Sequence, residues 1–370
     1  MKEVNRFNLF VFLSTFARGM IDTFIPVVLY VKGFSLEYIL LFLLIRCFLC
    51  LVTNREIINL GKHIKFKGVL IIGSILFGFT YVYLAFMGNS LTELVFIGVL
   101  EGLYTAFYWG GRHYYALEVL PSRQLGDEAG NIVIFGQLAI IPAAFIGGLI
   151  IDHMTLYSVT FISVVIFLFS IMPLMKIKED RNKEGKINIT KIRKGLPKKA
   201  ISFFIFDNFK VLGGIFFNIY LFLHVMDKFS YIGLFNIAVG ITSMIFVYFF
   251  SRKMDHDRKD YLILSSALLG LVWITKVNVE LPLLMLIVGF LEGLTVKMHE
   301  TAAVRNLYAL GKQYNAHSYI SFYETISQIV RILIILLAFY LKDLRLIIYF
   351  CIIGTIIGGI IGFDDGKAEY

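Results

Sequence analysis

The stretches VFIGVLEGLYTAFYW at 95–109 and LLMLIVGFLEGLTVK at 283–297 share the letters LEGL, which stand at 100–103 and again at 291–294. Each copy lies in an apolar run which, with its flanks, has the roughly 20 residues that a helix needs to cross a bilayer. A carboxylate is costly in such a run. The recurrence of the motif 191 positions later indicates two related halves, in each of which the glutamate has a role that offsets its cost.

The composition is that of a membrane protein. Of the 370 residues, 58% are hydrophobic and 16% are charged, whereas soluble domains average roughly 45–50% and 25%. The apolar runs are too long and continuous for barrel strands, which alternate over about 10 residues. The sequence therefore predicts an all-α integral membrane protein with twelve transmembrane helices. Their expected ranges are 7–31, 35–53, 67–87, 91–117, 127–151, 155–175, 200–225, 229–250, 260–277, 281–308, 316–341 and 344–363.

The basic residues are unevenly divided between the two sides of this bundle. About 23 of the 35 Lys and Arg fall at the chain ends and in alternate loops, and about 5 in the opposite loops. The basic loops are 54–67, 118–126, 176–199, 251–259 and 309–315. Because positive loops stay in the cytoplasm, we expect a protein of the cell (cytoplasmic) membrane with both termini cytoplasmic. The net charge of +9 then reflects topology, and no nucleic-acid partner is expected.

The longest polar stretch divides the spans six and six. We expect an N-terminal six-helix bundle at 1–176, a cytoplasmic linker at 177–199 and a C-terminal six-helix bundle at 200–370. A shift of 191 residues places the fourth span on the tenth and brings Lys210 within one residue of Arg18. Parallel repeats of this kind build transporters whose substrate site lies between the halves.

This organisation resembles the major facilitator superfamily. The most similar loop is SRKMDHDRK at 251–259, in which Asp255, Arg258 and Lys259 match the acidic and basic positions of the family's gating loop between helices 8 and 9. Ser251 stands at the Gly position of that loop. The equivalent loop of the first half keeps only GKH at 61–63 and lacks the Asp. The resemblance implies two pseudo-symmetric six-helix bundles around a central cavity.

The fifth span carries IPAAFIGG at 141–148, which partly resembles the family's antiporter signature GPxxGG. This favours export. Within the first span, FARGM at 16–20 is similar to the start of lipoteichoic-acid-type glycolipid flippases of the same superfamily, which also have an Arg there. Those proteins carry a Glu three residues earlier, where this chain has Thr15.

Ionisable residues inside spans are the strongest functional signal, because each costs roughly 2.5–3.5 kcal/mol unless it faces a cavity or a partner. They fall on spans 1, 2, 4, 7, 10 and 11. They are Arg18, Asp22, Arg46, Glu101, Arg112, His113, Asp207, Lys210, Glu292, Lys297, His299, Glu300, Arg305, Glu324 and Arg331. The resemblance implies that helices 1, 4, 7 and 10 line the cavity, that 2, 5, 8 and 11 flank it, and that 3, 6, 9 and 12 face lipid. We therefore expect both LEGL glutamates to face the cavity.

Helical spacing groups several polar residues on one face. The fourth span presents a stripe at i, i+3, i+7, i+11 and i+14, and the eleventh one at i, i+4 and i+7. The first stripe is Glu101, Tyr104, Tyr108, Arg112 and Tyr115, and the second is Glu324, Gln328 and Arg331. Both are expected to face inward. The aromatic residues around Arg112 could form a stacking or cation–π wall; they are Tyr104, Tyr108, Trp109, Tyr114 and Tyr115.

Two interpretations of these charges stay open. Three local pairs could simply neutralise each other, or could bind substrate or gate the pathway. The pairs are Arg18 with Asp22, Asp207 with Lys210, and Lys297 with Glu300. For Arg112, His113 and Arg305, which lie toward the cytoplasmic ends of their spans, snorkelling or a gate is favoured over contact with the solute.

Glu101 and Glu292 have no opposite charge within one turn of their own helices. A carboxylate in a cavity of low dielectric is pushed toward its neutral form, so it could load and release protons near neutral pH. These two residues are the first candidates for proton carriers. Glu324 and His299 come next, the latter because imidazole titrates near that range.

The leading hypothesis is a secondary active transporter that exports a small or amphiphilic solute, such as a drug or metabolite, by alternating access coupled to protons. One alternative is a flippase for a lipid-linked sugar, and another is a non-transporting membrane receptor or assembly partner. Membrane lipids are the other expected contacts, and we expect a monomer. The abundance of Phe, Ile, Lys and Tyr is typical of an AT-rich, bacterial genome.

An enzyme is not expected. The residues HETAA at 299–303 begin like the zinc motif HExxH, but Ala303 stands where the second histidine ligand would be. The chain has no phosphate-binding GxxxxGK[ST] motif and no nucleophile elbow. Neither a cofactor nor a metal is expected.

Overall fold

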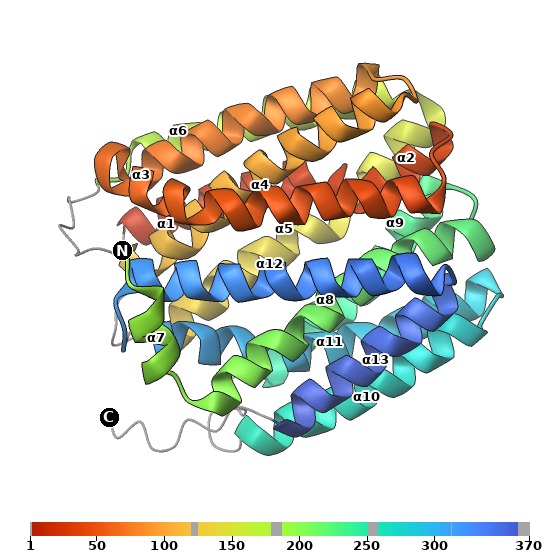
Figure 1. Ribbon diagram of the computed structural model, residues 1–370. Helices are drawn as coiled ribbons and strands as arrows, with labels where there is room; N and C mark the ends of the chain where they lie inside the picture. The colour runs from red at the N-terminus through yellow and green to blue at the C-terminus, as the bar shows by residue number, and fades with distance from the viewer. Residues whose placement is uncertain (1, 120–124, 179–186, 251–257, 312, 362–370) are drawn as a thin grey trace.

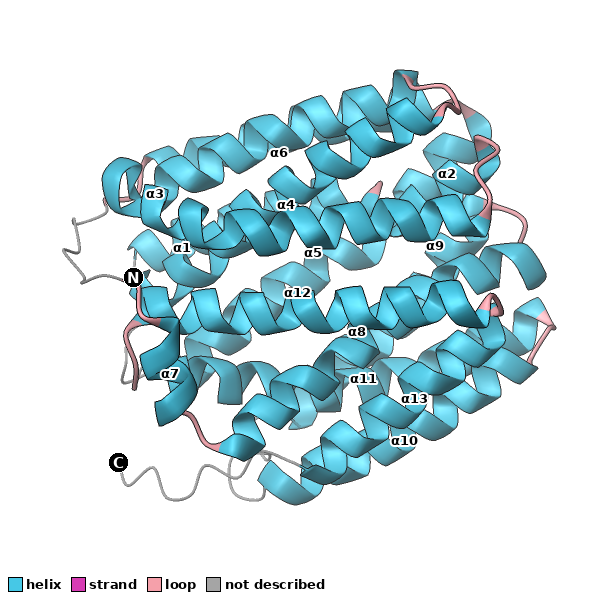
Figure 2. Ribbon diagram, viewed as in Figure 1, coloured by secondary structure: helices cyan, strands magenta, loops and turns pink. Residues whose placement is uncertain are grey.

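The computed structural model describes residues 2–119, 125–178, 187–250, 258–311 and 313–361, and these ranges are almost entirely helical, with no strand (Figures 1 and 2). The elements are α1 (Lys2–Gly19), η1 (Asp22–Phe24), α2 (Ile25–Val31), α3 (Leu36–Phe86), α4 (Leu91–Val119), α5 (Leu125–His153), α6 (Leu156–Met175), α7 (Ile189–Gly195), α8 (Lys198–His224), α9 (Phe229–Phe250), α10 (Arg258–Asn278), α11 (Pro282–Gly311), α12 (Ala316–Leu341) and α13 (Leu344–Ile361).

The predicted all-α membrane fold is confirmed. Ten of the described segments are long and apolar enough to cross a membrane, and a shorter apolar helix covers Leu262–Asn278. The 51 residues of α3 hold both the second and the third expected spans. The loop expected at 54–67 is helical instead, apart from a break at Lys65 (φ 65°, ψ 156°). Ile57 and Ile58 are buried there, and this packing keeps the segment helical.

The first span is broken where its charges lie. Helix α1 ends at Gly19, the single turn η1 follows, and α2 resumes with Pro26 in its first turn. Proline is tolerated there because the first backbone N–H groups of a helix have no intrahelical acceptor. The break places Arg18 in the last turn of α1 and Asp22 in η1.

The helices pack in two groups that follow the chain order (Figure 1). In the first group, α1 contacts α5 and α6, and α3 contacts α4 and α6; in the second, α8 contacts α13, α9 contacts α11, and α10 contacts α11 and α13. The main contacts between the groups are α5 with α9 and α3 with α12.

The glycines of the two LEGL stretches make equivalent close contacts. A Cβ on Gly102 would lie 2.9 Å from Leu49 Cβ of α3, and the thiol of Cys50 donates to the Gly102 carbonyl at 3.2 Å. Gly293 stands against the Val239 carbonyl of α9, and the Ser243 hydroxyl donates to its carbonyl at 2.9 Å. The repeated motif therefore holds α4 against α3 and α11 against α9.

The two ends of the bundle are built differently. At the end that holds α7, here termed the linker end, the Arg6 guanidinium donates to the Lys176 carbonyl at 2.5 Å, and the Asn188 N–H donates to the Ser318 hydroxyl at 3.0 Å. At the opposite end, termed the far end, the Asp152 carboxylate accepts the N–H groups of Phe229 at 3.1 Å and Ser230 at 2.8 Å. Helix α5 of the first group thereby holds the start of α9 of the second.

Candidate functional site

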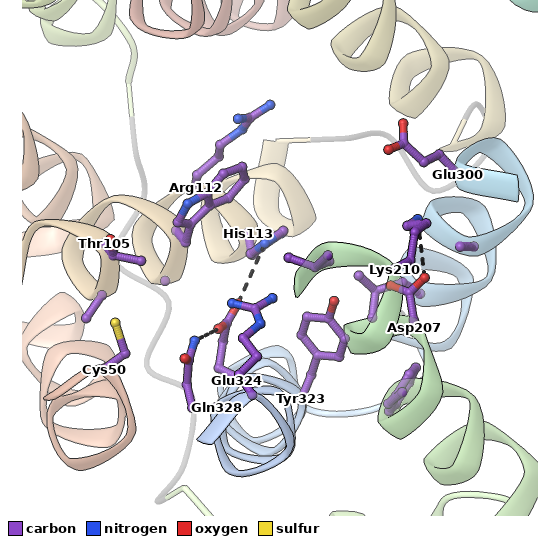
Figure 3. A pocket seen from close by; sticks show the side chains of 18 of the residues that line it. Cys50, Thr105, Arg112, His113, Asp207, Lys210, Glu300, Tyr323, Glu324 and Gln328 are labelled. Atoms are coloured by element: carbon purple, nitrogen blue, oxygen red, sulfur yellow. Dashed lines mark hydrogen bonds and ion pairs between the residues drawn. The ribbon is translucent and has the colours of Figure 1, made fainter. Parts of the chain in front are cut away.

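A cavity of about 460 Å³ lies between the two groups of helices. Its charged and polar walls come from α1, α3, α4 and α5 on one side and from α8, α11 and α12 on the other. Figure 3 shows labelled side chains of α3 and α4 facing those of α8, α11 and α12. The charged lining residues are Arg18, Arg46, Arg112, Asp207, Lys210, Lys297, Glu300, Glu324 and Arg331, with His113 beside them. All of these were predicted as site residues or span charges from the sequence. They lie on the four expected cavity helices, spans 1, 4, 7 and 10, and on two flanking ones, spans 2 and 11.

Two arginines approach the same aromatic rings on the wall made by α1 and α4. The guanidinium carbon of Arg18 lies 4.9 Å from the centre of the Trp109 ring, and that of Arg112 lies 5.0 Å from it. Both also approach Tyr108, at 4.7 and 6.0 Å. Such distances are those of cation–π contacts. The expected cation–π wall is therefore present, with Trp109 in the cavity lining.

The neighbouring tyrosines do not line the cavity as the stripe on the fourth span predicted. Tyr104, Tyr108 and Tyr115 are buried. Tyr108 shares a 3.0 Å hydrogen bond with the hydroxyl of Ser14, and Tyr115 packs on Phe7 with ring centres 4.9 Å apart. The tyrosines of the stripe face α1 and the aromatic core of their own group, because burying large aromatic rings removes much apolar area from water; Arg112 of the same stripe lines the cavity.

The pair of Arg18 and Asp22 forms as expected. Arg18 Nη2 lies 2.7 Å from Asp22 Oδ2, and the hydroxyl of Tyr81 donates to the other carboxylate oxygen. Arg18 lines the cavity and Asp22 lies behind it. The Nε of Arg18 is buried and has no hydrogen-bond partner in the described part of the chain.

Glu101 lies beneath the cavity wall rather than in it. It is 3% exposed, and its Oε1 is 4.0 Å from Nε of Arg46 and 3.5 Å from the Thr105 hydroxyl. Its Oε2 is buried without a hydrogen-bond partner among the described residues. Arg46 and Thr105 line the cavity above it. The expectation that this glutamate faces the cavity directly is wrong, because its neighbours cover it.

Glu292 does not face the cavity either, so that expectation is also wrong. Both of its oxygens contact the ammonium of Lys276 on α10, at 2.7 and 2.6 Å, and the Trp273 indole donates to it at 2.8 Å. The ammonium lies 3.3 Å from the centre of the Phe217 ring. This cluster is enclosed by α8, α10 and α11, and Lys276 is the charged partner of Glu292 within it. Sequence reasoning missed Lys276, which stands at the very end of an expected span.

The α12 wall carries the second polar stripe, as predicted. Glu324 Oε1 lies 3.7 Å from His113 Nε2 of α4, and Gln328 donates to Oε2 at 3.5 Å. The Arg331 Nε donates to the Asn208 side-chain oxygen at 2.8 Å. Figure 3 shows Glu324 between His113 and Gln328. This is a polar contact between the two groups of helices across the cavity, and it places His113 in the lining rather than at the membrane surface.

The remaining predicted charges gather on α8 and α11. Asp207 lies 3.3 Å from Lys210 Nζ and 3.2 Å from Nε2 of His299, whose other ring nitrogen meets the Ser266 hydroxyl at 3.0 Å. His299 is buried behind Asp207 and does not line the cavity. Lys297 Nζ lies 2.9 Å from Glu300 on α11, and Figure 3 shows Glu300 on the same side of the cavity as Lys210. The side chain of Arg305 lies outside the described residues.

The predicted gating loop cannot be placed. Asp255 lies outside the described residues. Arg258 and Lys259 begin α10, and their side chains are also outside the described part. Within the residues that the structure describes, no group of His, Cys, Asp and Glu could hold a metal ion.

Comparison with known families decides the identity of this helical bundle. The family model described as Major Facilitator Superfamily matches residues 7–333. The chain belongs to the major facilitator superfamily. No curated protein matches it. Members of this superfamily are membrane transporters and are generally not enzymes. The protein is thus an integral membrane transporter for a small molecule, and the charged cavity is the candidate site for that molecule.

Proposed function

We propose that this protein is a secondary active transporter that exports a small or amphiphilic solute by alternating access, coupled to protons. The observation that carries the proposal is the cavity of about 460 Å³ lined by side chains of both helix groups. A volume between about 300 and 1,000 Å³ is typical of sites that enclose organic molecules. Opposite walls on separate groups allow the site to open when one group moves against the other.

The moving units in this proposal are the bundles 1–176 and 200–370, joined by the linker 177–199. The linker end faces the cytoplasm of the cell, because α7, with Arg193 and Lys194 in its last turn, lies there and basic segments stay in the cytoplasm. The transporter works as a monomer in the cytoplasmic membrane. In an export cycle the hydrogen bonds of Asp152, which hold α5 and α9 together at the far end, must break before the solute can leave on that side.

Glu101 is the proposed proton carrier. Its Oε2 has no hydrogen-bond partner in the described structure, and its nearest cation, Arg46, is 4.0 Å away. A carboxylate with so few contacts loses little stabilisation of its charged form when it takes up a proton. Arg46 lies between it and the cavity, so a proton on Glu101 changes the charge felt by the solute. Glu324, which lines the cavity itself, is the second candidate.

Glu292 is the weakest candidate, because protonation would break its two contacts with Lys276. A buried cation would then be left without its partner, at a cost of several kcal/mol.

Purified protein in liposomes with a pH-sensitive dye inside tests the proposal. A transported solute should dissipate an imposed proton gradient in the wild type, and Glu101→Gln should abolish this exchange. Glu93→Gln is the matched control: it removes a carboxylate of the same helix whose bonds are local, to Gly88 and Ser90.

Normal exchange by Glu101→Gln would remove that residue from the mechanism. Flipping of a fluorescent lipid-linked sugar, with no flux of soluble solutes, would favour the flippase. If the wild type moves neither kind of molecule nor protons, a non-transporting receptor or assembly partner is favoured.

A further inference from the structure

The charged groups of the cavity can be matched with partners almost completely, and one cation is left over. Arg18 pairs with Asp22, Lys210 with Asp207 and Lys297 with Glu300. Arg46 faces Glu101 at 4.0 Å. Arg331 is held by the Asn208 side chain at 2.8 Å.

Arg112 differs from all of these. It lines the cavity, yet among the described residues it has neither a carboxylate within the 4.0 Å of an ion pair nor, unlike Arg331, a side-chain hydrogen bond; its contacts are with the rings of Tyr108 and Trp109. In Figure 3 its side chain extends away from Glu324 and Asp207. A charged group inside a membrane protein is costly when it lacks a partner. The unmatched guanidinium therefore marks a place where a negative group of the solute would be stabilised.

Arg18 provides a second, independent sign at the same place. Its guanidinium and that of Arg112 lie 4.9 and 5.0 Å from the centre of the same Trp109 ring. Although Arg18 is paired with Asp22 through Nη2, its Nε is buried and has no hydrogen-bond acceptor within the described chain. Two guanidinium groups beside one indole thus have unused donors, and guanidinium donors match the paired oxygens of carboxylates and phosphates.

The size of the cavity restricts what carries this negative group. A space of about 460 Å³ is far larger than an inorganic ion needs, since one water molecule occupies only about 30 Å³ in the liquid. Aromatic side chains stand on both walls, with Trp109 on α4 and Tyr323 on α12. The cavity therefore offers apolar contact to an organic body in addition to the anion site.

We propose that the transported solute is an organic anion whose phosphate or carboxylate group binds Arg112 and Arg18 beside Trp109. This rests on the proposed function and narrows it to a class of substrate. The same chemistry would recognise a soluble organic phosphate or the phosphate headgroup of a lipid.

Binding to the purified protein, measured by calorimetry at low salt, tests the inference without requiring transport. The probes are matched pairs that differ in one anionic group: AMP with adenosine, glucose 6-phosphate with glucose, and benzoate with benzyl alcohol. Protein in nanodiscs of phosphatidylcholine, titrated with short-chain phosphatidylglycerol, tests the headgroup. We expect at least one anion to bind tenfold or more tightly than its neutral partner, because charge-assisted hydrogen bonds are about twice as strong as neutral ones.

Arg112→Gln should weaken that binding about tenfold or more, and Arg112→Lys should restore part of it. Arg345→Gln is the control, because it removes one positive charge from an exposed pair with Glu280 far from the cavity. Binding of phosphatidylglycerol, with no binding of the soluble anions, would assign the site to a lipid headgroup.

Three outcomes would overturn the inference. They are equal binding of the two members of every pair, no anion with a dissociation constant below about 1 mM, the upper end of typical substrate levels, and equal binding by Arg112→Gln and Arg345→Gln. These outcomes are separate from failure of the proposed function. Anion binding that depends on Arg112, in a protein that drives no proton or solute flux, would keep the anion site and reject the transporter mechanism.

Discussion

Lys276 and Glu292 form an ion pair that is enclosed within one group of helices. The ammonium nitrogen lies 2.6 Å from Oε2 and 2.7 Å from Oε1 of the carboxylate, and the two side chains are 2% and 8% exposed. Glu101, at the equivalent position of the other half, is 4.0 Å from its nearest basic group. The two halves thus share a motif and use its carboxylate differently: one is bound to a cation, and the other is held loosely below the cavity.

Glu292→Gln should destabilise the protein by about 3–5 kcal/mol, because the ammonium of Lys276 would stay buried without its partner. The measurement is the free energy of unfolding in detergent. Glu280→Gln, which breaks the exposed pair with Arg345, should cost less than about 1 kcal/mol. Replacement of both members, Glu292→Gln with Lys276→Met, should recover part of the loss. A single variant as stable as the wild type would show that the pair does not carry this energy.

Asp152→Asn should loosen the far end. The wild-type carboxylate accepts two backbone N–H groups at the start of α9, and each bond to a charged group is worth about 1.5–3 kcal/mol. Amide hydrogen exchange of the peptide that contains Phe229 and Ser230 should become about tenfold faster or more. Asp343→Asn removes a similar bond within a single group of helices, at the start of α13. It should accelerate exchange there and leave α9 unchanged.

Gly148→Ala should separate α5 from α9. A Cβ at this position would lie 2.5 Å from the carbonyl oxygen of Phe229 and 2.8 Å from the Ser230 nitrogen. Because those atoms belong to the backbone, the helices must shift, and we expect a loss of about 1–3 kcal/mol in thermal unfolding. Gly214→Ala on α8 is the control, since its Cβ would meet nothing within 4 Å. That variant should be neutral or gain up to about 1 kcal/mol from helix propensity. Equal melting temperatures of the two variants would contradict the close contact.

Asn54→Ala should loosen the linker end. Its amide donates across the two groups to the Ser321 carbonyl at 3.1 Å. Cys50 lies one turn earlier on α3 and lines the cavity. Its alkylation by N-ethylmaleimide, followed by mass spectrometry, should therefore be faster in the variant. Cys351, buried on α13, serves as an internal reference whose rate should not change. Unchanged labelling of Cys50 would mean that this hydrogen bond does not limit access.

The sequence predicted the helices of the site better than it predicted the facing of individual side chains. The cost of a charge in lipid restricts ionisable residues to helices that have somewhere to put them, so their distribution over spans was informative. Arg18, Asp207 and Glu324 all come from expected helices and line the cavity. That restriction applies to whole helices, and it holds regardless of how each helix is rotated.

Rotation could not be read from single residues. Glu292 and Lys297 are five positions apart on α11, which places them about 140° apart around a helix of 3.6 residues per turn. Lys297 lines the cavity and Glu292 cannot then face it. The decisive partner, Lys276, belongs to another helix, and a contact of that kind is set by tertiary packing. In the same way, packing among aromatic rings decided that Tyr108 is buried while its neighbour Trp109 reaches the cavity.

The place of Trp109 also gives the protein a built-in optical reporter. The chain has only two tryptophans. Trp109 stands in the cavity wall, stacked on His113 with ring centres 5.5 Å apart, whereas Trp273 is 3% exposed and bonded to Glu292. Entry of a solute changes the surroundings of the first indole and leaves the second as a steady background. Intrinsic fluorescence of the unlabelled transporter should therefore follow the filling and emptying of its cavity in real time.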